Sequence, residues 1–410
     1  MTRYDAIVVG AGPAGCASAI LLAERGWSVL LLDKAAFPRP KICGELLSPE
    51  AARLLDRLGV LKEVDAAAQP IAGMRIVAPD GTRLEARYPT EGPWRGYRGH
   101  ALAVPRRVLD RLLFERARAL PIDVRERHRV IDLAVRDGAV TGVRVEDADG
   151  RAVEAAAPLV VGADGRASVV ARALGLVRPH RLRCLALVQH VEGLAPLGDL
   201  GEIYVDPPDY AILNPVAPGL VNLGLVVPQA HTRAFRGRLE TFLAARLRQL
   251  RHLAPRLEGM RAAGPLLAMG PLAYRVDQPA VGGVALVGDA AGFYDPFTGE
   301  GLYTALRSAE LLAEVAHAGL RAGDCSRGAL AAYARARRAA FRGKARLTRA
   351  LQAVIRRRPL ADLAARALAR RPALLGALMG VLGDAVPPRA LLRLDLLRPP
   401  RLAVDRRGPP

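Results

Sequence analysis

Short apolar runs that end at glycine or aspartate mark the beginning of the chain. Residues 4–9 form the first run and stop at a glycine, and residues 28–32 form the second and stop at Asp33. The stretch between them, residues 16–25, is rich in alanine, leucine and glutamate and ends before Gly26, a composition typical of a helix. Strand, glycine turn, helix and strand in this order predict the opening βαβ unit of a doubly wound parallel sheet.

Further along the chain, stretches with the 3.6-residue repeat of a helix alternate with stretches that have the two-residue repeat of a strand. They predict helices over residues 49–58 and 107–119, a hairpin over 73–88 with its turn at 79–82, a three-stranded meander over 129–155 and a buried strand over 159–161. The Asp-Gly pairs at 137–138 and 149–150 supply the turns of the meander. From residue 184 to 227, short strands separated by glycine and proline predict an antiparallel sheet.

The remaining elements complete an α/β fold. Residues 236–253 predict a helix, 284–287 a buried strand, 301–318 a long helix, and the last 80 residues helical structure. We therefore expect three parts: a Rossmann-like nucleotide-binding domain (residues 1–72, 101–180 and 281–325), an antiparallel-sheet substrate domain interleaved with it (73–100 and 181–280), and a helical, basic C-terminal region (326–410).

Composition indicates a globular protein without a membrane span. The chain has 410 residues, 51% of them hydrophobic and only 24% charged, which is typical of a packed core. The longest apolar stretch near the C-terminus, residues 373–383, is much shorter than the roughly 20 residues of a spanning helix. Glycines and a proline interrupt the apolar N-terminal run, so a signal peptide is not indicated. We expect a cytoplasmic protein, with peripheral membrane contact as an open alternative.

The net charge of +20 is concentrated at the C-terminus. Residues 331–410 carry 19 Lys or Arg against 4 Asp or Glu. A solvated basic helical face is the favoured interpretation, and attraction to an anionic membrane surface or an acidic carrier protein is the alternative. Nucleic acid is disfavoured because no aromatic residues cluster among the arginines. The four cysteines and seven histidines show no metal-ligand spacing, so we expect no metal site.

Residues 10–15 carry the glycine fingerprint of a dinucleotide site. The first glycine permits a tight turn, the second lets backbone N–H groups approach a pyrophosphate, and the third allows the helix to pack on the strand. The pyrophosphate lies at the positive end of the helix, and an acidic residue after the second strand accepts hydrogen bonds from a ribose. The predicted binding residues of this segment are Gly10, Gly12, Pro13, Ala14, Gly15, Asp33 and Lys34.

Two later segments place an acidic residue directly after a buried strand. Asp164 lies in the sequence VVGADGRAS (residues 160–168), and Asp289 follows Gly288 and precedes the loop DPFTGEG (295–301). An aspartate at such a strand end can hold the hydroxyl groups of a polyol chain. FAD has a ribityl chain and NAD has none, so these segments favour FAD.

With these three segments in this order, the chain resembles the flavoprotein superfamily of geranylgeranyl reductases, flavin-dependent halogenases and aromatic hydroxylases. The resemblance runs from about residue 4 to 310 and is closest to geranylgeranyl-reductase-like proteins, through FPRPKICGELLSP (37–49) and PFTGEG (296–301). It implies an FAD-binding domain in which Asp289 holds the ribityl chain. It also implies that Pro296, Gly299 and Gly301 line the pyrimidine side of the flavin, and that Arg107 approaches its phosphate and ribityl region.

The chemistry stays open between several alternatives. Because a second glycine fingerprint is absent, we expect NAD(P)H to bind transiently or another protein to deliver electrons. A monooxygenase acting on a hydrophobic small molecule is favoured over a C=C reductase or dehydrogenase, and a non-catalytic flavin-binding protein is the minor alternative. Halogenase activity is disfavoured because no lysine lies between Lys62 and Lys344. Where related reductases resemble Tyr-x-Trp-x-Phe-Pro, this chain has Ile212 and Asn214.

Cys43 is the one candidate catalytic side chain. It lies in the glycine-containing loop that, by the resemblance, approaches the flavin. A functional interpretation has the thiol beside the ring, guarding the substrate or donating a proton. The alternative, which the residue type favours, is a small half-buried residue of a turn.

Overall fold

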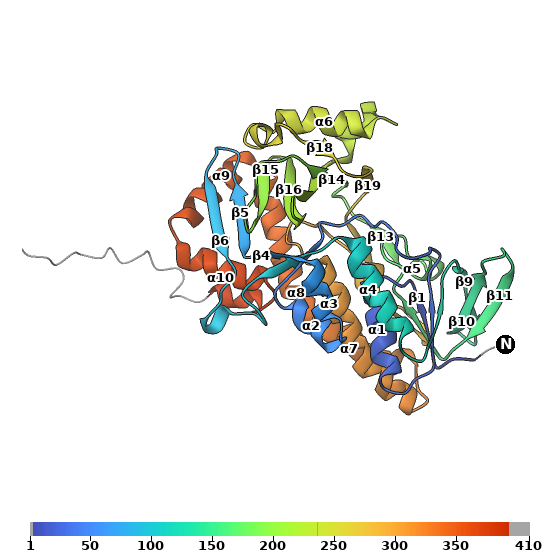
Figure 1. Ribbon diagram of the computed structural model, residues 1–410. Helices are drawn as coiled ribbons and strands as arrows, with labels where there is room; N and C mark the ends of the chain where they lie inside the picture. Colours follow the sequence, from blue (N-terminus) through green and yellow to red (C-terminus); the bar gives the residue numbers. More distant parts are fainter. Residues whose placement is uncertain (1–2, 236, 393–410) are drawn as a thin grey trace, which may run out of the picture.

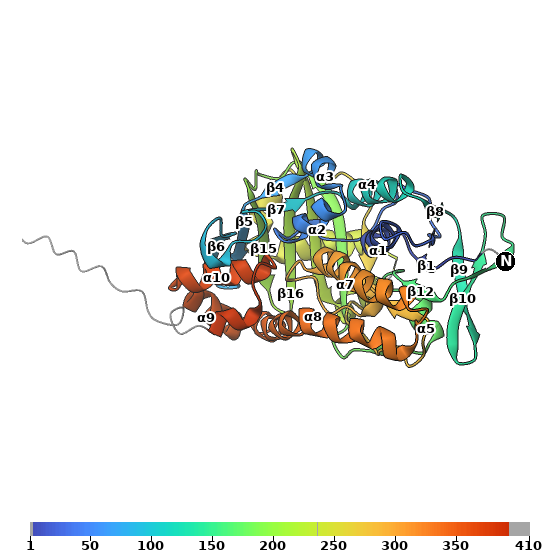
Figure 2. The same cartoon turned by 90° about the horizontal axis from the view of Figure 1, so that it is seen from below.

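The computed structural model describes residues 3–235 and 237–392 (Figures 1 and 2). A parallel five-stranded sheet forms one half of the molecule, in the order β21-β12-β1-β2-β8. Its strands are β1 (Ala6–Val9), β2 (Val29–Leu32), β8 (Ile122–Arg125), β12 (Leu159–Gly162) and β21 (Val284–Leu286). Strands β1, β2, β12 and β21 are apolar and buried because helices cover one face of the sheet and further strands the other, whereas the edge strand β8 carries Asp123 and Arg125. The predicted βαβ unit is confirmed.

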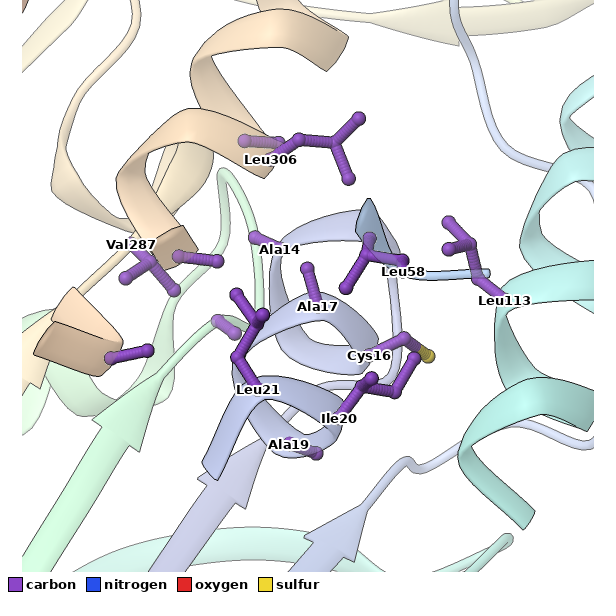
Figure 3. Close-up of a cluster of buried hydrophobic side chains, with 14 of the residues drawn as sticks. Ala14, Cys16, Ala17, Ala19, Ile20, Leu21, Leu58, Leu113, Val287 and Leu306 are labelled. Atoms are coloured by element: carbon purple, nitrogen blue, oxygen red, sulfur yellow. The ribbon is translucent and has the colours of Figure 1, made fainter. Parts of the chain in front are cut away.

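Helix α1 (Pro13–Ala23) packs at the centre of one face of this sheet. Every residue of α1 is buried, which agrees with its lack of a polar side. Side chains of α1 contact Val287 and Leu306 on one side and Leu58 and Leu113 on the other (Figure 3). Helices α4 (Arg106–Arg118) and α7 (Gly301–Arg321) pack directly against α1, and α2 (Ala51–Arg57) and α3 (Leu61–Ala67) continue the layer through contacts with α7 and α4.

The predicted meander covers the other face of the parallel sheet. It consists of β9 (Arg129–Arg136), β10 (Ala139–Glu146) and β11 (Ala152–Ala156), paired in antiparallel fashion. Alternate residues of β2 point to the two faces: Val29 and Leu31 pack on the helices, whereas Leu30 and Leu32 pack on the meander. A short helix, α5 (Val169–Ala173), lies on this side as well.

An eight-stranded, mostly antiparallel sheet forms the second half, which we call the substrate sheet. Its order is β18-β14-β17-β16-β15-β5-β6, with β19 paired to β14, and only β5 and β15 run parallel. The strands are β5 (Gly73–Val77), β6 (Arg83–Arg87), β14 (Cys184–Glu192), β15 (Leu200–Asp206), β16 (Asp209–Ala217), β17 (Leu220–Pro228), β18 (Arg261–Ala262) and β19 (Leu267–Met269). Helix α6 (Leu239–Gln249) covers its outer face (Figure 1).

Short strands connect the two halves. A three-stranded sheet combines β3 (Leu46–Leu47), β7 (Ala101–Ala103) and β4 (Gln69–Ile71), and β13 (Val177–Pro179) pairs with β20 (Tyr274–Val276). Five 3-10 helices lie among the described residues: η1 (Gly92–Trp94), η2 (Gln229–Phe235), η3 (Ala254–Leu257), η4 (Gly288–Ala291) and η5 (Pro388–Leu392). The chain passes between the halves several times, as the interleaved prediction requires.

The C-terminal helices do not form a core of their own. Helix α8 (Arg327–Ile355) packs along α7 and adds Leu330 and Tyr333 to the core beside the parallel sheet. Helices α9 (Arg358–Ala369) and α10 (Pro372–Leu382) pack against β6 and the core under the substrate sheet. They lie at the opposite end of the molecule from the meander (Figures 1 and 2). Among the described residues, no helix is long and apolar enough to cross a bilayer.

Candidate active site

A cavity of about 630 Å³ lies between the parallel sheet and the substrate sheet. One part of its wall comes from the turn between β1 and α1, the loop after β2, residues 163–172 and the segment 288–302. The other part comes from the inner face of the substrate sheet. We call these parts the polar cradle and the apolar lobe.

The glycine fingerprint forms part of the wall of the polar cradle. Gly10 has a φ of +97°, and a Cβ added there would lie 2.7 Å from the carbonyl oxygen of Ala163. A Cβ on Gly15 would lie 1.7 Å from the carbonyl oxygen of Gly10, so the close approach of helix and turn requires glycine. Helix α1 begins after Gly12 with no side-chain cap, and its first N–H groups lack partners within the helix. Gly12, Pro13 and Ala14 line the cavity.

Asp33 lines the cavity and also fixes the turn beside it. Its Oδ2 accepts a hydrogen bond from the Ala11 N–H at 2.8 Å, and its Oδ1 accepts one from the Ala35 N–H at 2.9 Å. Arg39 lies 3.4 Å from Oδ2, and Lys34 is a further lining residue. The carboxylate therefore holds the fingerprint in place in addition to its predicted contact with a ribose.

Asp164 and Arg166 carry buried polar atoms without a protein partner. The Oδ2 of Asp164 accepts from the Val169 N–H at 2.6 Å, but its Oδ1 has no hydrogen bond, and neither has the Nε of Arg166. Burial raises the pKa of Asp164. Unsatisfied buried polar atoms are costly, so these two side chains fit a polar ligand in the cradle. A nucleotide cofactor could satisfy both atoms, because its hydroxyl groups can donate to the Asp164 oxygen and its phosphates can accept from the Arg166 nitrogen.

Asp289 lines the polar cradle at the end of β21. Its backbone begins a tight turn in which Gly288 has a φ of +56° and donates its N–H to Ser308 Oγ at 2.9 Å. Burial raises the pKa of the Asp289 carboxyl, and the nearby cations Lys41 and Arg106 oppose that rise. Burial also lowers the pKa of Lys41. Both charged groups line the cavity, as do Pro296, Gly299 and Gly301.

The arginine at the start of α4 that lines the cavity is Arg106 and not Arg107, the residue that the resemblance places near the cofactor. Arg107 is exposed and does not line the cavity. Arg106 is buried, lines the cavity and binds Asp110 through two hydrogen bonds of 2.7 and 2.9 Å. One residue along a helix turns the side chain by about 100°, since 3.6 residues complete a turn. The sequence located the helix but not its rotation.

Cys43 lies at the cavity wall, as the sequence predicted. It is partly buried, its Sγ accepts a weak hydrogen bond from the Glu45 N–H at 3.3 Å, and burial raises its pKa. Glu45, Arg106 and Asn222 also line the cavity but were missed, because no local pattern distinguishes them from other polar residues. Among the described residues, no group of His, Cys, Asp and Glu could hold a metal ion.

The substrate sheet supplies the apolar lobe. The strand at residues 210–215 contributes Ile212 and Asn214, so the two positions that depart from the reductase pattern do face the cavity. The other side chains of the lobe are mostly aliphatic or aromatic and include Met74, Ile76, Ala186, Val188, Ile203, Val226, Met269, Leu272, Phe293 and Phe297. This wall fits a hydrophobic molecule next to the cradle.

A parallel sheet with a glycine fingerprint, a polar cradle and an adjoining apolar lobe defines the chain as an FAD-dependent oxidoreductase. It belongs to the family described as "FAD binding domain", whose model matches residues 3–348. It also belongs to the geranylgeranyl-reductase-like flavoproteins, the group of its sequence relatives.

Two relatives illustrate the similarity in sequence. The digeranylgeranylglycerophospholipid reductase of Methanosarcina mazei is 28% identical over 336 residues, covering 79% of this chain and 77% of that protein. Digeranylgeranylglycerophospholipid reductase 2 of Methanopyrus kandleri is 31% identical over 342 residues and covers 81% of each protein.

Solved structures share the fold. The flavin-dependent brominase Bmp2 superposes with a TM-score of 0.82 at 21% identity, covering 95% of this chain and 98% of that one. A geranylgeranyl bacteriochlorophyll reductase-like protein of Thermoplasma acidophilum gives a TM-score of 0.77 at 22% identity, covering 97% and 100%. At these identities the likeness concerns the fold alone.

Proposed function

We propose that this protein reduces carbon–carbon double bonds of a hydrophobic, isoprenoid-type substrate. The observation that carries the proposal is the direct continuity of the polar cradle with the apolar lobe, in one cavity. The sequence relatives that are digeranylgeranylglycerophospholipid reductases support this choice over the monooxygenase that the sequence alone favours. Ile212 and Asn214 alter the wall of the lobe, so the substrate of this chain differs in shape from that of proteins with the Trp and Phe pattern.

The residues of the cradle would hold the cofactor in a defined order. The fingerprint glycines and the start of α1 would bind the pyrophosphate, Asp33 the ribose, and Asp289 the ribityl chain. The segment 296–301 would line one edge of the ring. Bound FAD supplies hydride transfer, while the protein orients the two reactants and excludes water. The aliphatic wall of the lobe would exclude water from the reacting groups.

Cationic side chains of the cradle bear on the identity of the electron donor. Arg39, Lys41, Arg129 and Arg172 line the cradle with positive charge, which would attract the phosphates of a nicotinamide cofactor as well as those of FAD. We therefore propose NAD(P)H as the electron donor, bound transiently.

Turnover under strictly anaerobic conditions tests the proposed reaction. The purified, FAD-loaded protein is incubated with NAD(P)H or dithionite and a polyprenyl compound, and the products are analysed by mass spectrometry. We expect a mass gain of two hydrogens per reduced double bond without oxygen. A product that carries oxygen and forms only in air would support a monooxygenase instead. Consumption of NAD(P)H with no altered substrate in either atmosphere would favour a flavin-binding protein without this activity.

A further inference from the structure

Tyr274 contacts the segment that carries Asp289 from outside the cavity. We call this segment, residues 288–293, the Asp289 turn. Tyr274 is the first residue of β20, and it is buried but is not among the residues that line the cavity. Its phenol O–H donates a hydrogen bond to the backbone carbonyl of Asp289. Its backbone N–H donates to the Phe293 carbonyl at 2.9 Å, and its own carbonyl accepts from the Phe293 N–H at 3.3 Å.

The Asp289 turn contains two glycines that make its backbone adaptable. Gly288 has a φ of +56° and Gly292 a φ of +114°, conformations that glycine adopts at little cost. The Gly292 N–H donates to the Asp289 carbonyl at 3.1 Å. This carbonyl therefore accepts one bond from within the turn and one from Tyr274, which occupies both of its lone pairs. Because the glycines leave the turn adaptable, the contacts with Tyr274 help to fix where the Asp289 side chain lies.

The Tyr274 hydroxyl keeps its proton in these surroundings. Burial raises the pKa of the phenol well above its usual value, and the nearby Asp289 carboxylate acts in the same direction, whereas Arg166 opposes the rise. A protonated phenol is the form that can donate to a carbonyl oxygen. The bond to the Asp289 carbonyl is therefore available throughout the neutral pH range.

The ring of Tyr274 contacts an arginine of the segment at Asp164. The guanidinium carbon of Arg166 lies 5.6 Å from the ring centroid, within the range of a cation–π interaction. Arg166 lines the cavity, and its Nε is buried without a hydrogen-bond partner. One side chain outside the cavity thus contacts residues from both of the later nucleotide-binding segments.

Strand β20 is itself attached to the part of the chain that follows Asp164. It pairs in antiparallel fashion with β13, and Tyr274 lies opposite Pro179 in this pair. Asp164 accepts a hydrogen bond from the Val169 N–H at 2.6 Å, at the beginning of α5, and α5 leads into β13. Tyr274 therefore connects the Asp289 turn to a strand pair next to the segment at Asp164.

We propose that Tyr274 is a positioning residue for FAD: its hydroxyl fixes the turn that presents Asp289 to the cofactor, and its ring orients Arg166 in the cradle. Tyr274 acts through these two side chains and lies outside the cavity itself. The inference uses the proposed contact between Asp289 and FAD, but it does not depend on which reaction the bound flavin performs.

Titration of the apoprotein with FAD, followed by flavin fluorescence, measures the contribution of Tyr274. Tyr274→Phe keeps the ring and removes one hydrogen bond, so the dissociation constant of FAD should rise roughly 3- to 10-fold. Tyr274→Leu also removes the ring beside Arg166 and should weaken binding by about a further 2- to 5-fold. If Tyr274→Leu does not fold, Tyr274→Phe alone decides the role of the hydroxyl.

Tyr204→Phe is the matched control. Tyr204 is also buried, and its hydroxyl donates to Glu202 Oε2 at 2.7 Å, but it lies in the core on the outer face of the substrate sheet. Both variants lose one hydrogen bond, so the melting temperature of the apoprotein should fall by similar amounts. Only Tyr274→Phe should lose affinity for FAD. An equal loss of FAD affinity in Tyr204→Phe would attribute the effect to lower stability and overturn the proposal.

A double-mutant cycle with Asp289→Ala tests whether the hydroxyl acts through Asp289. When Asp289 is already alanine, Tyr274→Phe should change FAD affinity by less than about 2-fold, because the two residues then no longer act together. The same loss in both backgrounds would overturn the proposal, and so would unchanged affinity in Tyr274→Phe alone. These outcomes are separate from failure of the proposed function. If no double bond is reduced but the cycle shows this coupling, the role of Tyr274 stands and the reaction is wrong.

Discussion

At the scale of single residues, the site is built from charged groups that the fold buries without fully satisfying them. Asp289 is half-buried near Lys41, and Asp164 keeps one buried oxygen without a partner. Burying such groups costs free energy unless they are paired. A bound cofactor that supplies hydroxyl groups and phosphates would recover that cost, which is why these residues are our best candidates for FAD contacts.

Replacement of Asp289 by alanine should weaken FAD binding by roughly 10- to 100-fold, since a hydrogen bond to a charged group contributes about 1.5–3 kcal/mol. The change is measured by titrating the apoprotein with FAD and following flavin fluorescence. Asp277→Ala is the control, because Asp277 is exposed and pairs with Arg178 on the surface. An unchanged dissociation constant in Asp289→Ala would contradict the proposed role.

His190 should make stability depend on pH. Its hydrogen bond with Glu45 raises its pKa, while burial and, to a smaller extent, Arg107 act in the opposite direction. The folded state therefore favours the protonated imidazole, and this stabilisation is present below the ordinary pKa and lost as pH rises through the raised value. Between about pH 6 and pH 9, the melting temperature should fall by roughly 1–2 °C more in the unmodified protein than in His190→Gln. His252→Gln, at the Pro79 carbonyl, should behave like the unmodified protein.

At the scale of elements, α8 supports the loop that would line the flavin ring. Asp295 in this loop accepts hydrogen bonds from Tyr210 Oη at 2.7 Å and from Gln352 Nε2 on α8. Thr298 and Thr348 approach each other at 3.3 Å. The sequence of α8 contains no recognisable motif. Only the structure shows that side chains of α8 hold the loop at residues 295–298.

Asp295→Asn should stabilise the protein at neutral pH and not in mild acid. Burial raises the pKa of Asp295 to about 6. The folded state thus favours the neutral acid, and that stabilisation is lost as pH rises through about 6. Asparagine is neutral at every pH, so its melting temperature relative to the unmodified protein should be roughly 1–3 °C higher at about pH 7.5 than at about pH 5. Differential scanning calorimetry measures both. If the difference in melting temperature between the variant and the unmodified protein is the same at both pH values, the pKa of Asp295 is not raised by burial.

At the scale of the whole molecule, α9 and α10 lie at one end (Figure 1), and α9 exposes both arginines and apolar side chains there. Some arginines pair with the substrate half: Arg366 binds Asp80 at 2.7 Å, and Arg358 lies 3.7 Å from Asp206. Leu363 is nevertheless 66% exposed and Leu360 is 40% exposed on α9. A positive helix with exposed leucines fits an anionic membrane surface, which we propose as the partner of this end.

Leu363→Asp should reduce co-sedimentation with vesicles rich in anionic phospholipid by roughly 3- to 10-fold. The variant loses the apolar side chain that would insert into the membrane, and the negative charge of the aspartate is repelled by the anionic surface. Val135→Asp is the matched control: Val135 is 52% exposed but lies on the meander at the other end of the molecule. Higher salt should weaken binding by screening. Binding that is indifferent to anionic lipid would exclude the membrane and leave an acidic carrier protein as the candidate partner.

The sequence by itself determined the elements whose signal is local. The fingerprint at 10–15, the Asp-Gly turns of the meander and the apolar strands before Asp164 and Asp289 each lie within a short window, and the parallel sheet and the FAD cradle followed from them. Their physics is also local: a turn needs glycine, and a strand buried on both faces needs an apolar run.

Only the tertiary structure decided which polar residues meet. Cys43, His190 and Asn222 lie far apart in the chain and come together through strand register, which no single segment encodes. The rotation of α4 selected Arg106 over Arg107, and packing directed α8 to the loop at Asp295. Register, helix rotation and packing depend on contacts between distant segments, so they are fixed when the chain folds and are absent from any local pattern.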